Sequence, residues 1–265
     1  METVIIGRKA AAGAGEITVC RTLFQRKERR KIMVVTYMFE IGQLDDDAFF
    51  QKCLGEVSAE RQKKVHRARK REDQNRILGA GLLLAHGLAE YGICEQDTVF
   101  QYGENGKPYL ADMPQIHFNL SHSGDYAAAA FSSREVGIDI ECERKNGRKI
   151  AARFFAEEEI RNMQYCKSKE EEDQLFLRYW TLKESFLKVT GYGMALPLNA
   201  FRFELQDTVK VIWEAATEEY YFQEFEMYGP ADIVADREAD GIDMYRIAVC
   251  ALEDEFAPEP IWIKK

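Results

Sequence analysis

An alternating segment at residues 136–141 constrains the fold more than any other stretch of this 265-residue chain. Apolar side chains occupy every second position, at Val136, Ile138 and Ile140. This period of two predicts a half-buried strand, so Asp139 and Glu141 project from one face, roughly 7 Å apart. Two carboxylates on a rigid strand can hold a hard cation such as Mg²⁺. The segment therefore predicts a sheet and, on it, a candidate metal site.

A second segment, residues 180–188, has the period of a helix and carries Trp180, Glu184 and Lys188 on one stripe. If this stripe faces the strand, a third carboxylate and an ammonium join the two strand carboxylates. The expected metal ligands are then Asp139, Glu141 and Glu184. The alternative is a solvated strand face together with a surface ion pair between Glu184 and Lys188, worth about 0.3–0.5 kcal/mol.

Composition and charge exclude several function classes. Hydrophobic residues make up 46% of the chain, which is ample for a core. The formal net charge of −9 argues against general binding to nucleic acid or to a membrane surface. No apolar run approaches the roughly 20 residues that span a bilayer, and no secretory signal opens the chain. The cysteines are scattered without a Cys-x-x-Cys pair, so we expect reduced thiols and a cytoplasmic protein.

Residues 1–32 form a basic segment of different character, ending in a charged run at 26–31. This segment is either a targeting or binding tail or a leader that precedes a natural start at Met33. Because it has little hydrophobic periodicity, it has little to bury. We therefore expect residues 1–32 to be a non-structural leader or extension, which mass spectrometry of the native N-terminus would test.

The rest of the chain divides into two similar halves, each running strand, helices and strands over roughly 100 residues. In the first half we expect strands at 34–41, 98–102, 116–121 and 126–131, a helix at 48–54, and one long helical region from an N-capping Ser58 to Gly92. In the second half we expect helices at 150–155, 157–165 and 173–190 and strands at 136–141, 201–205, 209–213, 220–228 and 244–252. The sequence thus predicts an α+β protein of two similar, pseudo-twofold subdomains, each a small antiparallel sheet packed against helices. The expected boundaries are 33–134, 135–255 and a C-terminal tail at 256–265.

Several groups outside the acidic cluster could bind phosphate. Lys107 follows a glycine turn and precedes a proline, and a predicted strand ends in a hydroxyl and an imidazole at Ser121 and His122. The densest basic run lies on the long helical region and includes Arg61 and Lys64. The alternatives are a solvated helix face and a structural hydrogen-bonding role for His122. The sequence lacks a serine nucleophile elbow and the ligand spacing of a zinc site.

Three motifs occur in a specific order. They are Asn119-Leu120-Ser121-His122-Ser123-Gly124, Gly137-Ile138-Asp139-Ile140-Glu141 and Trp180-Thr181-Leu182-Lys183-Glu184-Ser185-Phe186-Leu187-Lys188. Together they resemble the 4′-phosphopantetheinyl transferases, and most closely the long, surfactin-synthetase-activating type. The resemblance extends from about Met33 to Leu252. It implies a pseudo-dimeric monomer with the active site in the cleft between the two subdomains.

The resemblance implies transfer of phosphopantetheine from coenzyme A to a serine of an apo acyl or peptidyl carrier protein, with release of adenosine 3′,5′-bisphosphate. It assigns Asp139, Glu141 and Glu184 to Mg²⁺, with Mn²⁺ as a possible substitute. It makes Glu184 the candidate catalytic base and Lys188 a second catalytic group, beside the phosphate or leaving group. Both assignments agree with the chemistry, because attack at phosphorus builds charge that a metal and cations stabilise.

The implied coenzyme A contacts are Arg61, Lys64, Arg76, Lys107, Ser121, His122 and Lys188. Arg61 stands where the family often has lysine, which keeps the charge and changes its geometry. The basic run would also attract an acidic carrier protein. Two other functions remain open: a different Mg²⁺-dependent phosphoryl or nucleotidyl transferase, and a coenzyme A or carrier-binding module that has lost catalysis.

Overall fold

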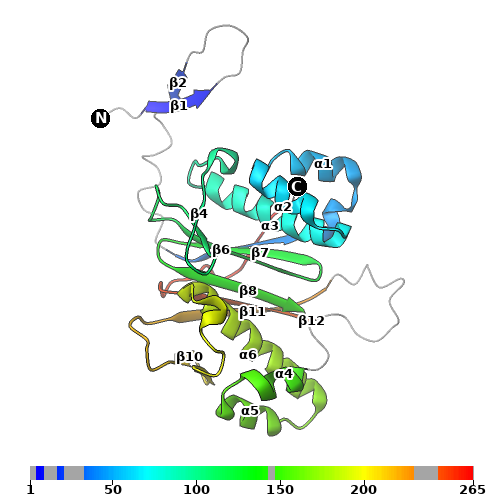
Figure 1. Ribbon diagram of the computed structural model, residues 1–265, viewed down its shortest axis with the longest axis vertical. Helices are drawn as coiled ribbons and strands as arrows, with labels where there is room; N and C mark the ends of the chain where they lie inside the picture. Colours follow the sequence, from blue (N-terminus) through cyan, green and yellow to red (C-terminus); the bar gives the residue numbers. More distant parts are fainter. Residues whose placement is uncertain (1–3, 9–16, 21–32, 143–146, 230–243, 265) are drawn as a thin grey trace.

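The computed structural model describes residues 4–8, 17–20, 33–142, 147–229 and 244–264. Within the predicted leader, β1 (Val4–Arg8) and β2 (Ile17–Cys20) pair antiparallel. The rest of residues 1–32 lies outside the described residues, so the leader remains a prediction. Figure 1 shows the arrangement of helices and strands in the main body.

The N-terminal half is a four-stranded sheet with the strand order β13-β3-β7-β6, in which β3, β7 and β6 are antiparallel neighbours. These strands are β3 (Val35–Glu40), β6 (His117–Ser123), β7 (Tyr126–Ser132) and β13 (Ile261–Trp262). A separate short ladder joins β4 (Gln101–Tyr102) to β5 (Pro108–Tyr109). The helices are α1 (Asp47–Leu54), α2 (Ala59–Arg67) and α3 (Arg71–Ala89), with 3₁₀ turns η1 (Ile41–Asp45) and η2 (Glu95–Asp97).

The long helical region predicted from Ser58 to Gly92 is two helices. Ser58 does cap the first helix, since its Oγ accepts a hydrogen bond from the Arg61 nitrogen. The chain then becomes extended at Ala68 and Lys70 before α3 begins. The segment between the two helices, residues 68–70, has almost no apolar side chain that could pack a continuous helix against the core. At the start of α3 the Arg71 guanidinium donates to the Leu44 carbonyl at 2.9 Å, which ties the new helix to η1.

The C-terminal half is an antiparallel sheet with the strand order β11-β12-β8. Its strands are β8 (Val136–Cys142), β11 (Tyr221–Tyr228) and β12 (Met244–Ala251), and a separate hairpin joins β9 (Arg202–Leu205) to β10 (Val209–Ile212). Its helices are α4 (Gly147–Phe154), α5 (Glu157–Gln164) and α6 (Lys169–Thr190), followed by the 3₁₀ turn η3 (Gly193–Ala195). Gly191 ends α6 in the left-handed conformation, with φ of 72°.

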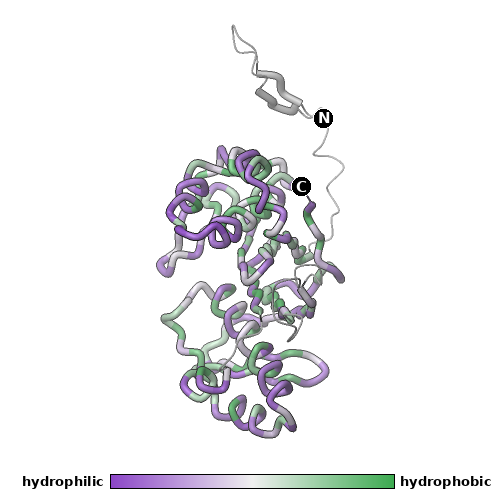
Figure 2. The backbone as a smooth tube through the Cα atoms, turned by 90° about the vertical axis from the view of Figure 1, so that its right-hand side faces the viewer, coloured by the Kyte–Doolittle hydropathy of each residue, from purple (hydrophilic) through white to green (hydrophobic). Residues whose placement is uncertain are grey.

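Three hydrophobic clusters stack these elements as helices, sheet, sheet, helices (Figure 1). Strand β7 shows how the layers form, since Ala127 and Ala129 belong to the cluster under α1–α3 while Ala128 and Ala130 face the other sheet. The alanines are small enough for the two sheets to pack closely. In Figure 2 the helical segments mix purple and green along their length, as expected for helices with one polar and one apolar face. The predicted α+β class with two sheet-and-helix subdomains is confirmed.

The last residues return to the N-terminal sheet. Val34 forms a bridge with Phe256, and β13 adds a parallel strand to β3. The segment that we expected as a tail at 256–265 therefore completes the sheet of the first half, which is mixed and not purely antiparallel. The division at 33–134 and 135–255 stays a proposal. In the part of the chain that the structure describes, no helix is both long enough and apolar enough to cross a membrane.

Candidate active site

Strand β8 and helix α6 meet because position 137 is glycine. A Cβ atom on Gly137 would lie 2.2 Å from the Ser185 carbonyl oxygen and 2.5 Å from the Val189 nitrogen, far inside van der Waals contact. Only a residue without a side chain lets the helix backbone approach the strand this closely. The glycine therefore positions the polar stripe of α6 directly over the carboxylates of β8.

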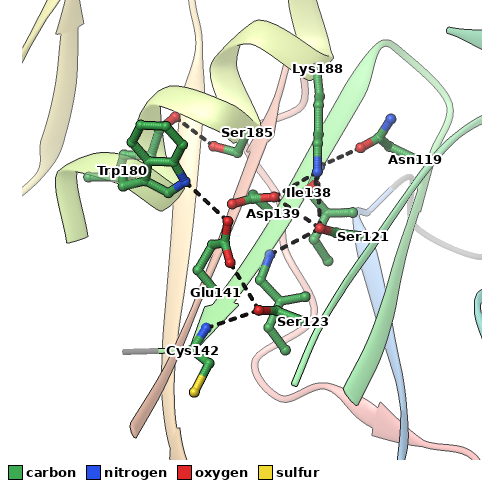
Figure 3. A network of polar contacts seen from close by, with 12 residues as sticks. Asn119, Ser121, Ser123, Ile138, Asp139, Glu141, Cys142, Trp180, Ser185 and Lys188 are labelled. Atoms are coloured by element: carbon green, nitrogen blue, oxygen red, sulfur yellow. Dashed lines mark hydrogen bonds and ion pairs between the residues drawn. The ribbon is translucent and has the colours of Figure 1, made fainter. Parts of the chain in front are cut away.

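A seam of side-chain hydrogen bonds joins the two sheets along β6 and β8. The side chains of Asn119, Ser121 and Ser123, on one face of β6, accept hydrogen bonds from alternate backbone N–H groups of β8. The donors are the nitrogens of Ile138 at 3.0 Å, Ile140 at 3.3 Å and Cys142 at 3.2 Å. The seam satisfies buried N–H groups that would otherwise lack a partner, and it fixes the register between the two sheets (Figure 3).

The two strand carboxylates lie beside this seam, and both are buried. Asp139 Oδ1 accepts from the Lys188 ammonium at 2.7 Å and from the Ser121 hydroxyl at 2.9 Å. Glu141 accepts from the Trp180 indole N–H at 3.1 Å and from the Ser123 hydroxyl at 2.9 Å. The predicted meeting of the α6 stripe with the strand is therefore present in the structure (Figure 3).

Glu184 lies on the same α6 stripe and lines a cavity of about 280 Å³. Lys107, Asn119, Leu187 and Lys188 also line this cavity. Among the described residues, no three acidic, histidine or cysteine side chains are close enough together to hold a metal ion. The structure thus brings Asp139 and Glu141 together with Lys188 and has Glu184 in the lining of a cavity beside Lys188, so the role of Glu184 as a third metal ligand stays a prediction.

One atom of this acidic pair fits a divalent cation. The second oxygen of Asp139, Oδ2, is buried and has no hydrogen-bond partner. A buried carboxylate oxygen without a partner is costly, and a hard cation satisfies it. Mg²⁺ needs only one or two protein carboxylates when water and substrate phosphates complete its shell. Asp139 and Glu141 therefore suit Mg²⁺ as a partial ligand set.

Cations gather around His122 at the end of β6. The pKa of the His122 imidazole is lowered, mainly by burial and also by the charges of Lys188, Arg76 and Arg61. A backbone hydrogen bond acts in the opposite direction and raises it. His122 nevertheless remains accessible to solvent. Arg76 is held in place, because its Nε donates to the Gly124 carbonyl at 2.9 Å. Three of the predicted coenzyme contacts, Lys188, Arg76 and Arg61, thus lie near enough to act on a fourth, His122, and this positive charge suits the binding of an anion.

The ammonium groups of Lys64 and Lys107 already have protein partners, as that of Lys188 does. Lys64 forms an ion pair with Glu60 at 2.8 Å and a hydrogen bond with the Tyr102 hydroxyl at 3.0 Å. Lys107 forms an ion pair with Glu135 at 2.5 Å. Of these two, Lys64 is the more exposed, with a side chain 41% accessible to solvent.

Sequence reasoning missed the site roles of Asn119, Ser123 and Glu135, and it gave Trp180 none. The alternation of short polar residues along β6 was visible as a period of two, and it could have predicted the seam with β8. The partners of Glu135 could not be read from the sequence, because they lie 18 and 28 positions away along the chain.

The site places two buried carboxylates of strand β8 beside the Lys188 ammonium of α6, with further cations near His122. Comparison with known families agrees. Residues 135–250 match the 4′-phosphopantetheinyl transferase superfamily, and residues 46–134 match the 4′-phosphopantetheinyl transferase N-terminal domain. The chain belongs to the 4′-phosphopantetheinyl transferase superfamily.

Its relatives include bacterial enzymes of similar length. A 4′-phosphopantetheinyl transferase of Bacillus subtilis is 34% identical over 77% of this chain and 86% of its own. The 4′-phosphopantetheinyl transferase Sfp of Bacillus subtilis strain 168 is 33% identical over 80% of this chain and 88% of its own. The resemblance that the three motifs indicated is therefore confirmed at the level of the family.

Proposed function

We propose that the protein transfers 4′-phosphopantetheine from coenzyme A to a serine of an apo acyl or peptidyl carrier protein. The observation that carries the proposal is the arrangement at the subdomain boundary. There the Asp139–Lys188 pair, with one carboxylate oxygen unsatisfied, lies beside the cations around His122. Such a site can hold a pyrophosphate between a metal and cationic side chains.

In the proposed reaction the serine oxygen attacks the β-phosphorus of coenzyme A. A new O–P bond forms while the bond from that phosphorus to the bridging oxygen breaks. The serine proton passes to the Glu184 carboxylate, directly or through water, and the electron pair leaves with adenosine 3′,5′-bisphosphate. The position of Glu184 in the lining of the cavity that also contains Lys188 supports this role.

The remaining residues bind and orient. Asp139 and Glu141 would hold Mg²⁺, or Mn²⁺, which would neutralise charge that develops on the pyrophosphate oxygens. Lys188 contributes its charge from a fixed position, since its three donors go to Asp139, Ser121 and the Ile138 carbonyl. Arg61, Arg76 and His122 would bind the phosphates of coenzyme A. We further propose a monomer that acts in the cytoplasm on an acidic carrier protein.

The direct test is incubation of the protein with an apo carrier protein, Mg²⁺ and coenzyme A. We expect the carrier to gain about 340 Da, the mass of a phosphopantetheine group, and chelation of the metal by EDTA to stop the gain. A protein that binds coenzyme A but modifies none of several apo carriers is a binding module. Turnover of a nucleoside triphosphate without carrier modification would support a different phosphoryl or nucleotidyl transferase.

A second prediction concerns proton uptake at His122. Its pKa lies below the ordinary value of 6.5 in the free protein, so the ring is largely neutral at pH 7. A bound phosphate favours the charged imidazolium and raises that pKa. Coenzyme A binding should therefore take up a proton, and its affinity should rise as the pH falls from 8 to 6.

Calorimetry in two buffers of different ionisation enthalpy measures this uptake. His122→Asn should remove part of it and weaken binding by about tenfold, the equivalent of about 1.4 kcal/mol. His66→Asn, at an exposed histidine on α2, serves as the control. Coenzyme A carries titrating groups of its own, so only the difference between the two variants reports proton uptake by His122. Equal proton uptake in wild type, His122→Asn and His66→Asn would show that His122 does not bind the phosphate.

A further inference from the structure

A partly exposed ionic contact links the two halves of the protein beside the candidate active site, with the side chains of Lys107 and Glu135 19% and 43% exposed. Glu135 lies in the short connection between β7 and β8. One of its oxygens accepts from the Lys107 ammonium at 2.5 Å, and the other lies 3.1 Å from His117 Nδ1. We call these three residues, Lys107, His117 and Glu135, the Lys107 clasp.

The Lys107 ammonium has no donor left for a ligand. An ammonium has three N–H groups, and the acceptors around it are Glu135 at 2.5 Å, the Val136 carbonyl at 3.1 Å and the Val189 carbonyl at 3.3 Å. Val136 begins β8 and Val189 lies in the last turn of α6. Lys107 therefore joins the β4–β5 turn to the strand and to the helix of the other half.

A second contact ties the same turn to the same helix end. The Asn105 side-chain amide donates to the Gly191 carbonyl at 2.9 Å. Gly106 gives the turn its shape, since it adopts φ of 84°, a conformation that favours glycine. Asn105 and Lys107 thus hold the β4–β5 turn against the other half of the protein, in addition to the two-residue ladder between β4 and β5.

The clasp forms a wall of the candidate site. Lys107 lines the 280 Å³ cavity that also contains Glu184 and Lys188. On its other side, Lys107, His117 and Glu135 line a second cavity of about 380 Å³ under the β5–β6 connection. Movement of Lys107 would therefore change the width of the cavity at Glu184.

The charges within the clasp depend on one another. Burial acts to raise the pKa of Glu135, but the hydrogen bond with His117 and the charge of Lys107 lower it to about 2. Burial also lowers the pKa of Lys107, and Glu135 opposes that shift. Without the carboxylate, Lys107 would be a largely buried cation with only carbonyl partners, which is unfavourable.

We propose that Glu135 is a positioning residue that holds Lys107 as a strut between the two subdomains, so that the Lys107 ammonium sets the shape of the coenzyme A cavity and does not itself bind phosphate. This inference rests on the proposed function, because it assigns the cavity to coenzyme A. It differs from the direct contact with Lys107 that the family resemblance implies.

A double-mutant cycle separates a strut from a direct ligand. The variants are Glu135→Gln, Lys107→Met and the double variant, with Asp112→Asn as a matched control at an exposed carboxylate between β5 and β6. If the clasp is a strut, each single variant weakens coenzyme A binding by about tenfold, and the double variant is no weaker than the weaker single variant. The KM for coenzyme A should rise while kcat changes less than about twofold.

Other outcomes overturn the proposal. If Lys107 binds phosphate directly, Glu135→Gln frees the ammonium and keeps or improves the affinity, while Lys107→Met loses it. If the clasp only stabilises the fold, Glu135→Gln lowers the melting temperature and leaves the coenzyme A dissociation constant at the Asp112→Asn value. Calorimetric binding needs no turnover, so wild-type protein that binds coenzyme A without transferring it contradicts the proposed function alone. Wild-type protein that does not bind coenzyme A contradicts both.

Discussion

Replacement of Asp139 by asparagine is expected to lower the rate of phosphopantetheine transfer by a factor on the order of 10² to 10³, the usual cost of losing one preorganised electrostatic group. The asparagine keeps the size of the side chain and can still accept from Ser121. It loses the charge that pairs with Lys188 at 2.7 Å and the anionic oxygen that suits Mg²⁺. The measurement is kcat/KM for carrier modification at saturating Mg²⁺.

Two comparisons make the Asp139→Asn result specific. The variant should retain its fold, because Lys188 keeps its bonds to Ser121 and to the Ile138 carbonyl, and a thermal melt checks this. Asp207→Asn, at an exposed carboxylate between β9 and β10, should keep full activity. Wild-type rates in folded Asp139→Asn protein would show that the strand carboxylates are not part of the catalytic site.

Replacement of Lys183 by methionine is expected to destabilise the protein by about 3–5 kcal/mol, the usual cost of removing one partner of a buried ion pair. Lys183 and Glu159 lie 2.8 Å apart, and both side chains are 0% exposed. Burial raises the pKa of Glu159 and lowers that of Lys183, so each charge depends on the other. The pair also connects α5, α6 and β9, because Glu159 accepts from the Phe203 nitrogen and Lys183 donates to the Phe201 carbonyl.

Denaturant unfolding measures this loss. The double variant Lys183→Met with Glu159→Gln should be more stable than Lys183→Met alone, since it leaves no unpaired buried charge. Lys210→Met, at an exposed position of β10, should change the stability by less than about 0.5 kcal/mol. A Lys183→Met variant as stable as Lys210→Met would mean that the ion pair contributes little to stability.

Secondary structure could largely be predicted, because it depends on local periodicity. The alternation at Asp139 and Glu141, the helical stripe of Trp180 and Lys188, and the strand at the alanine run 127–130 all have the predicted type. The one long region that failed, between Ser58 and Gly92, lacked apolar residues in its middle. There a tertiary contact of Arg71 with the Leu44 carbonyl accompanied the change in chain direction.

Contacts between distant segments set the limit of prediction. Motif order correctly indicated the family, and the helical stripe of Lys188 could meet Asp139 only if that stripe faced the strand, as it does in the structure. It could not show that the Lys107 ammonium is already occupied by Glu135, because that pair joins positions 28 residues apart through the docking of one half on the other. For the same reason it could not show that the last residues return to β3.

The sequence by itself determined which residues carry charge and on which face of a strand or helix each one lies, because side-chain direction follows from a local repeat. Only the tertiary structure decided which of those charges meet. The close approach of α6 at Gly137 and the seam from Asn119 to Ser123 set those distances. As a result, Asp139 has one oxygen without a hydrogen-bond partner and Glu184 lines the neighbouring cavity. Lys107 forms a bridge between the two halves.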